Sequence, residues 1–248
     1  MKNYWLHWCL CLLAAGGAAA VYVATATSTP QEREQNRISQ CAGLRLSDKQ
    51  KNHLYQTVLA LKERQDWLIL VDPQHILPAD YKPADLTVQF QPHWPKKAHL
   101  RKEALEQMNI MAEAAKKDGI TLIPVSTYRT WKYQKMLKDR KPDNPYVAGA
   151  GESQHHLGTA VDFNTVNPSD ENIPPLVWLR EHAGEYGFSL SFPKGAEAEQ
   201  ESGYPYEAWH YRYITREAVQ LQDDFFDGDQ HKILAFLHDC VFNAPPAK

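Results

Sequence analysis

The pattern of apolar and polar residues predicts several helices. Between 100 and 119 apolar side chains recur at helical spacing, and Lys116, Lys117 and Gly119 follow as signals for a helix end. A second helix is expected over 48–64, where Ser47 and Gln50 have the spacing of a capping box. Similar but shorter patterns predict helices over 130–140, 174–188, 215–223 and 230–240.

Short apolar or alternating runs predict strands over 67–71, 120–128, 159–164 and 207–214. The Pro-rich stretch 72–86 and the segment 140–151 are expected to be ordered loops. No strand–helix–strand unit is repeated along the chain. We therefore expect an α+β fold with a small antiparallel or mixed sheet flanked by helices.

The beginning of the chain has the pattern of an export signal. Residues 4–26 carry no formal charge, follow Lys2, and end in the small residues Ala24-Thr25-Ala26. The run is also long enough to span a bilayer, so a retained anchor in the inner membrane is the alternative to a cleaved signal. Either reading predicts an exported protein of the periplasm or cell envelope.

Composition limits the partners and suggests one cross-link. Removing Lys2 from the 27 basic residues leaves 26 against 30 acidic ones, a net charge of −4 without a basic stripe, so we expect no nucleic-acid partner. After the leader only Cys41 and Cys240 remain. In an oxidising compartment such a pair predicts a disulfide, and two buried free thiols are the alternative.

The predicted domains are a leader over 1–26, a polar tether over 27–45, the main domain over 46–215 and a C-terminal helical extension over 216–248. With 248 residues the chain is long enough to bury a sizeable core in that one domain.

Two polar stretches together match a catalytic zinc site. In "GESQHHLGTAVDF" (151–163), Gly158 and the β-prone residues after it favour a turn and a strand, which could bring His155 and Asp162 together. In "YPYEAWHYRY" (204–213), Glu207 precedes His210 by three residues. Two histidines and one carboxylate leave an open zinc position for water, and a further carboxylate can move that water's proton.

A third stretch, "PVSTYRTWKYQ" (124–134), has Arg129 where a predicted strand gives way to a helix. Such junctions often carry functional side chains. The guanidinium could grip a carboxylate with two hydrogen bonds, or it could form a surface salt bridge. The residues alone leave both readings open.

These stretches resemble one known family. "SQHHLGTAVD" fits Ser-x-His-x-x-Gly-x-Ala-x-Asp and "EAWH" fits Glu-x-Trp-His, and further matches follow in the same order over about 68–215. The chain is thus similar to the VanY-like D-alanyl-D-alanine carboxypeptidases, zinc peptidases of the LAS group in bacterial cell walls. The resemblance implies a Hedgehog/DD-peptidase-like fold and a zinc-dependent rather than serine-type enzyme. We expect a monomer. Its substrates would be peptidoglycan stem peptides, which lose a C-terminal D-Ala.

The resemblance also implies roles for individual residues. One Zn²⁺ would be bound by His155, Asp162 and His210, with Glu207 as the catalytic base. His156 is not implied as a ligand, and Gln154 stands where a glutamate is common. The expected substrate-binding residues, around the terminal carboxylate, are Arg129, Ser153, Gln134 and Tyr128.

Three other readings stay open from the sequence. Close relatives include L,D-carboxypeptidases that act on tetrapeptide stems, and no residue here decides between the two specificities. A zinc-containing wall-binding module without turnover is a second alternative. Glu207 argues against it, because a purely structural zinc site does not require a catalytic base. The third is a non-haem iron oxygenase with two histidines and one carboxylate, which export disfavours.

Overall fold

The structure is a computed structural model, described here over residues 28–243, so the predicted leader lies outside the described residues. Its centre is an antiparallel sheet with strand order β3-β4-β6-β5. A hairpin of β1 (Leu86–Gln89) and β2 (Ala98–Arg101) forms a second, two-stranded sheet. The central strands are β3 (Pro124–Ser126), β4 (Ala160–Phe163), β6 (His210–Tyr213) and β5 (Phe188–Leu190).

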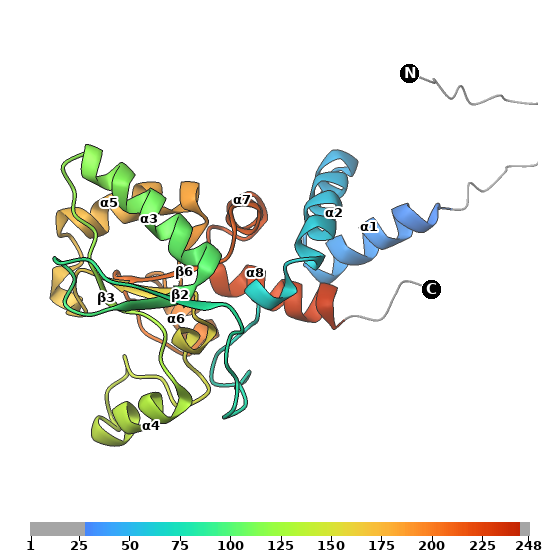
Figure 1. Ribbon diagram of the computed structural model, residues 1–248. Helices are drawn as coiled ribbons and strands as arrows, with labels where there is room; N and C mark the ends of the chain where they lie inside the picture. The colour runs from blue at the N-terminus through green and yellow to red at the C-terminus, as the bar shows by residue number, and fades with distance from the viewer. Residues whose placement is uncertain (1–27, 244–248) are drawn as a thin grey trace, which may run out of the picture.

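Helices surround this sheet (Figure 1). On one side lie α3 (Lys102–Lys117) and α5 (Pro174–His182), and on the other α4 (Trp131–Arg140) projects as a separate lobe. A further helical group stands to one end, built from α1 (Pro30–Cys41), α2 (Asp48–Lys62), α7 (Arg216–Phe225) and α8 (Gln230–Leu237). The arrangement confirms the expected α+β fold with helices flanking a small sheet.

The two middle strands form the rigid centre of the molecule. All four residues of β4 and all four of β6 are buried, because helices or loops cover both faces of the sheet. Phe163 lies edge-on against Phe188 and Tyr211 at ring separations of 6.4 and 6.2 Å. Packing on both faces already orders the backbone of these strands, so holding a polar side chain in place costs little further conformational entropy. They therefore suit residues that must keep a fixed geometry.

The strand expected over 67–71 is wrong. The chain forms a short 3₁₀ helix over Gln65–Trp67 and then an irregular, buried segment. The reason lies in β6, where the fully buried Arg212 donates to the carbonyls of Trp67 and Ile69 at 3.0 and 2.9 Å. Those carbonyls are satisfied by a guanidinium instead of a neighbouring strand.

Several boundaries also differ from the sequence pattern. The helix expected from 100 begins at Lys102, because the two preceding residues pair with β1 in a hairpin that was not predicted. The helix expected over 174–188 ends earlier, and Phe188 starts β5. The short helix α6 (Ala196–Ser202) was not predicted either.

Residues 27–45, expected to be a polar tether, contain helix α1. Thr29 and Glu32 form a capping box, and Pro30 occupies the first turn, where its missing N–H costs nothing. Ile38 is buried, and α1 packs against α2. Residues 28–45 are therefore part of the folded body. Across the described residues, no helix has the length and apolar character needed to cross a membrane.

A disulfide joins the two ends of the described fold. Cys41, at the end of α1, is bonded to Cys240, which follows α8, across a sequence separation of 199 residues. In the chain-entropy model a loop of this length restricts the unfolded state by about 5 kcal/mol, an upper-end figure. The bridge thus fixes the C-terminal extension against the N-terminal helices.

A buried carboxylate ties the same extension to the loop after residue 71. Asp72 accepts hydrogen bonds from the backbone N–H groups of Gln74 and His75 at 2.7 and 2.8 Å. Its side chain also contacts His75 Nδ1 at 2.9 Å and His231 Nε2, on α8, at 3.1 Å. Burial alone would raise the pKa of Asp72, but these hydrogen bonds outweigh it and hold the pKa well below the usual range.

Replacing Asp72 by asparagine is expected to lower the free energy of unfolding by about 2 kcal/mol near neutral pH. Because the folded-state pKa is depressed, this contribution is present above the unfolded pKa of about 3.9 and is lost as the pH falls through the folded value. Urea unfolding of wild type and variant should therefore give a difference that is full above about pH 5 and shrinks below about pH 4. Asp239→Asn, at an exposed carboxylate nearby, should stay within about 0.5 kcal/mol. A pH-independent difference for Asp72→Asn would contradict this account.

Candidate active site

The pairing of the central strands brings three polar residues together. Asp162 on β4 is directly opposite His210 on β6 and also opposite Ser126 on β3. Directly paired residues point to the same face of a sheet, so these side chains converge. His155 lies just before β4, in a 3₁₀ helix over Gln154–Leu157. That helix ends at Gly158, whose φ of +67° favours glycine.

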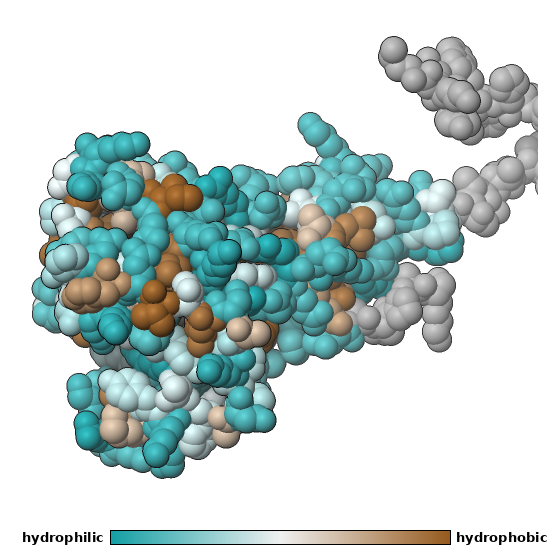
Figure 2. Space-filling view, in the orientation of Figure 1, coloured by the Kyte–Doolittle hydropathy of each residue, from teal (hydrophilic) through white to brown (hydrophobic). Residues whose placement is uncertain are grey.

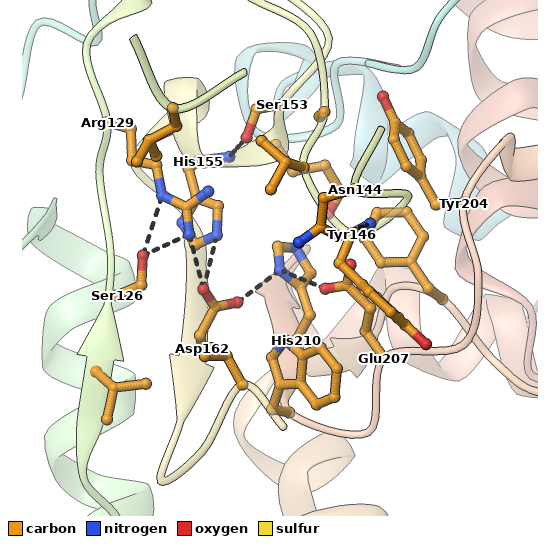
Figure 3. A pocket seen from close by; sticks show the side chains of 18 of the residues that line it. Ser126, Arg129, Asn144, Tyr146, Ser153, His155, Asp162, Tyr204, Glu207 and His210 are labelled. Atoms are coloured by element: carbon orange, nitrogen blue, oxygen red, sulfur yellow. Dashed lines mark hydrogen bonds and ion pairs between the residues drawn. The ribbon is translucent and has the colours of Figure 1, made fainter. Parts of the chain in front are cut away.

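His155, Asp162 and His210 form a buried group suited to a metal ion (Figure 3). His155 Nε2 is 3.2 Å from one carboxylate oxygen of Asp162, and His210 Nδ1 is 2.8 Å from the other. The three ligand atoms lie within 4.8 Å of one another. Within residues 28–243 no other histidine, cysteine or carboxylate group meets this criterion.

The electrostatics of the group also fit a metal. Burial, and next the nearby Arg129, lowers the pKa of His155 to about 3, which leaves a neutral imidazole with a free lone pair. Burial would raise the pKa of Asp162, but the two facing imidazoles outweigh it and keep the carboxyl ionised. Neutral imidazole and ionised carboxylate are the forms that bind zinc.

Gln154 fixes the orientation of His210. The Gln154 Oε1 atom, an acceptor, lies 3.3 Å from His210 Nε2, so Nε2–H donates to it and Nδ1 carries the lone pair. That lone pair faces an oxygen of Asp162 at 2.8 Å. Two acceptors this close need a cation or a proton between them, which is a further indication of a metal position.

Glu207 is the additional carboxylate beside the metal group. Its Oε2 atom is 3.7 Å from His210 Nδ1, and the residue is only 6 % exposed. Burial raises the pKa of Glu207 well above its usual value, the nearby Asp162 adds to the effect, and Arg129 opposes it. A carboxylate whose pKa is shifted upwards is suited to accept a proton near neutral pH.

Arg129 borders the same cavity, but its donors are largely occupied. Nε and Nη2 both donate to Ser126 Oγ, Nη2 also donates to Asp162, and Nη1 donates to Gln134. Four of the five guanidinium N–H groups therefore have acceptors within the protein. One N–H, on Nη1, is left for a ligand.

The other predicted substrate residues are distributed differently. Ser153 lines the cavity, and its hydroxyl also accepts from the backbone N–H of His155 at 3.3 Å. Gln134 is wholly buried behind Arg129 and donates to the Ala148 carbonyl at 2.8 Å. Neither Gln134 nor Tyr128 is among the side chains that line the cavity.

His156 stands apart from the metal group and links two loops. Its Nε2 accepts from the Gly151 N–H at 3.1 Å, so its Nδ1 carries the proton and donates to the Arg129 carbonyl at 2.7 Å. Burial lowers the pKa of His156, which favours this neutral form. The second histidine of the pair therefore holds the backbone of Arg129 in position.

Comparison with known proteins decides the family. The family model described as "VanY: D-alanyl-D-alanine carboxypeptidase" matches residues 97–216, a segment that contains every residue of the metal group. The chain belongs to the VanY family.

Three relatives illustrate the similarity. The putative carboxypeptidase YodJ of Bacillus subtilis is 32 % identical over 182 residues, which are 66 % of each chain. The structure of the LdcB LD-carboxypeptidase is 31 % identical, with a TM-score of 0.60, and the match covers 67 % of this chain and 84 % of LdcB. A zinc complex of the vancomycin-resistance D,D-pentapeptidase VanY is 26 % identical, with a TM-score of 0.55, and covers 68 % and 99 %.

The VanY-family site contains residues that the sequence did not single out. The cavity has a volume of about 430 Å³, and its wall includes Glu152 and Tyr204, joined by a hydrogen bond of 3.2 Å. The ring of Phe192 lies 5.0 Å from that of His210. The sequence around Glu152, Phe192 and Tyr204 did not indicate a role in the site, because single aromatic residues and glutamates are common in any chain.

Proposed function

We propose that this VanY-family chain is a zinc-dependent D,D-carboxypeptidase that removes the C-terminal D-Ala from peptidoglycan stem peptides. The observation that carries the proposal is the buried Glu207, which lies beside the His155–Asp162–His210 group without being needed to complete it. A purely structural zinc site closes its coordination and has no use for such a carboxylate. The same observation speaks against a wall-binding module without turnover.

In the proposed mechanism His155, Asp162 and His210 hold the zinc. When bound, zinc supplies Lewis-acid polarisation of a carbonyl and lowers the pKa of a water. Glu207 accepts the proton of the attacking water on its carboxylate and passes it to the nitrogen of the leaving D-Ala. Glu207 is placed for both transfers, because it is buried beside the ligand group and its pKa is raised by that burial.

Arg129 and Ser153 are proposed to bind the substrate's terminal carboxylate. Because only one guanidinium N–H of Arg129 lacks a protein acceptor, we infer a single hydrogen bond from Nη1 complemented by the Ser153 hydroxyl. Gln134 would act by orienting Arg129. A contact of Tyr128 with the substrate stays a prediction. Requiring a free carboxylate limits cleavage to the end of a peptide.

The test of specificity uses two natural stem lengths. Incubated with pentapeptide and tetrapeptide muropeptides, the protein should remove one D-Ala from the pentapeptide and leave the tetrapeptide intact, as measured by mass spectrometry. Both LdcB and VanY are similar to this chain, so the opposite result would assign it to the L,D-carboxypeptidases. No cleavage of either peptide would contradict the proposed enzyme.

We further propose that the protein acts outside the cytoplasm, where its substrates lie. We also propose that it acts as a monomer. The disulfide between Cys41 and Cys240 supports an oxidising compartment such as the periplasm. Cell fractionation combined with N-terminal sequencing distinguishes a cleaved leader from an anchor in the inner membrane.

Replacing Gln154 by alanine is expected to weaken zinc binding by about 10- to 100-fold, because His210 loses the acceptor that fixes its tautomer. Gln154→Glu should bind zinc more tightly than wild type, since an anionic acceptor makes the imidazole more basic. Competition with a chelator of known affinity measures both changes without an activity assay. Equal affinities in all three proteins would contradict the role given to Gln154.

A further inference from the structure

A basic segment lies next to the active-site cavity in a chain of net charge −3. Residues 129–142 contain six basic residues and one acidic residue, Asp139. They form helix α4 and its flanks, the lobe that projects below the sheet in Figure 1. Figure 2 shows mostly hydrophilic side chains over this lobe, with a hollow between the lobe and the main body.

One stripe of this lobe faces the cavity. Tyr133 and Leu137, one turn apart on α4, line it together with Lys141, which directly follows the helix. Lys96, from the loop between β1 and β2, lines the cavity as well. The wall therefore includes the proposed carboxylate-binding arginine, the side chains of Tyr133 and Leu137, and lysines from two separate segments.

The lysines at the mouth have no partner within the described part of the chain. Neither Lys96 nor Lys141 has a carboxylate oxygen within 4.0 Å of its ammonium group among residues 28–243, and both are exposed. Deeper in the cavity the cation Arg129 is paired with Asp162, and the Glu152 carboxylate accepts a hydrogen bond from the neutral Tyr204 phenol. The unmatched positive charge lies at the mouth.

We propose that Lys96 and Lys141 form a cationic subsite at the mouth of the cavity, which binds carboxylates that the substrate carries upstream of the scissile bond. This inference rests on the proposed function. With the terminal carboxylate at Arg129, the rest of the peptide extends outward along Tyr133 and Leu137. Side chains upstream of the scissile bond then lie in the part of the cavity that the two lysines line. The enzyme therefore prefers acidic stem peptides.

The test compares two pentapeptides that differ by one carboxylate. Both end in D-Ala-D-Ala, and the third residue is diaminopimelate in one and lysine in the other. The wild type should show a higher kcat/KM for the diaminopimelate peptide, by about 5- to 10-fold at about 0.05 M salt. The preference should diminish at about 0.5 M salt, where screening shortens the reach of exposed charges.

Reversing the charge of the two lysines tests whether they cause the preference for the acidic peptide. In the double variant Lys96→Glu/Lys141→Glu, the ratio of the two kcat/KM values should fall by about 5- to 10-fold, mainly through KM of the acidic peptide. The control is Lys49→Glu, at an exposed lysine on α2 at the far end of the molecule, which lowers the net charge by 2 where the double variant lowers it by 4. It should leave the ratio at the wild-type value.

The outcomes separate this inference from the proposed function. Release of D-Ala from the lysine peptide tests carboxypeptidase activity by itself, whatever the ratio. If both peptides are cleaved equally well, or if Lys49→Glu lowers the ratio as much as the double variant, the cationic subsite is wrong. It is also wrong if the two lysines govern binding to phosphatidylglycerol vesicles in a sedimentation assay while the peptide ratio stays unchanged.

Discussion

The Glu207→Gln variant is expected to lose about 10²- to 10⁴-fold in kcat while it keeps one zinc per chain. Glutamine has nearly the same size and fills the same buried position, but it cannot accept a proton. Glu207 lies 3.7 Å from His210 and is not part of the ligand group, so its replacement leaves the metal ligands in place. Turnover and metal content, measured on the same preparation, separate the two effects.

The matched control is Glu152→Gln, a second carboxylate on the wall of the same cavity. Glu152 is bonded to Tyr204 and to the backbone of Gly149, away from the metal ligands, so this variant should lose far less turnover than Glu207→Gln. A Glu207→Gln enzyme with near-wild-type turnover would remove the proton-transfer role. Loss of zinc from that variant would instead indicate that Glu207 is a ligand.

Replacing Asp162 by asparagine is expected to remove both zinc and activity, and also to destabilise the metal-free protein. Asp162 contacts both imidazoles and forms the ion pair with Arg129 at 2.9 Å. Removing one partner of a buried ion pair costs about 3–5 kcal/mol. The Arg129 side chain is 18 % exposed, so we expect about 2–3 kcal/mol here.

Chelator-treated proteins isolate this structural contribution, because neither wild type nor variant then gains stability from the metal. Ser126→Ala is the matched control: it removes another acceptor of Arg129 but leaves the carboxylate, and it should cost about 1 kcal/mol. Equal unfolding free energies of the metal-free wild type and Asp162→Asn would show that Arg129 needs no anionic partner. Retained zinc in Asp162→Asn would exclude the carboxylate as a ligand.

The sequence was sufficient to select the residues that converge at the cavity, but not to derive their convergence. The alternation over 159–164 predicts a strand, and β4 is there, although nothing in the pattern says that Asp162 is opposite His210. That register depends on contacts between residues 48 positions apart. The pairing therefore followed from the family resemblance and could not be obtained from local periodicity.

Other features depended on tertiary contacts that no local pattern records. The apolar run 67–71 has the composition of a strand, yet Arg212 takes up its carbonyls. In the sequence, Gln154 is notable only because the family commonly has a glutamate there. In the structure, its contact with His210 gives that position a physical role. The basic residues of α4 and its flanks are visible in the sequence, but only the fold shows that Lys141 and Lys96 line the same cavity.

The bond between Cys41 and Cys240 also sets an order of events during biosynthesis. The second cysteine is made almost two hundred residues after the first, so among the described residues the first thiol has no cysteine partner until nearly all of them have been synthesised. Once formed, the bridge holds the end of α1 beside the segment after α8, so the last residues of the described chain are fixed to the first.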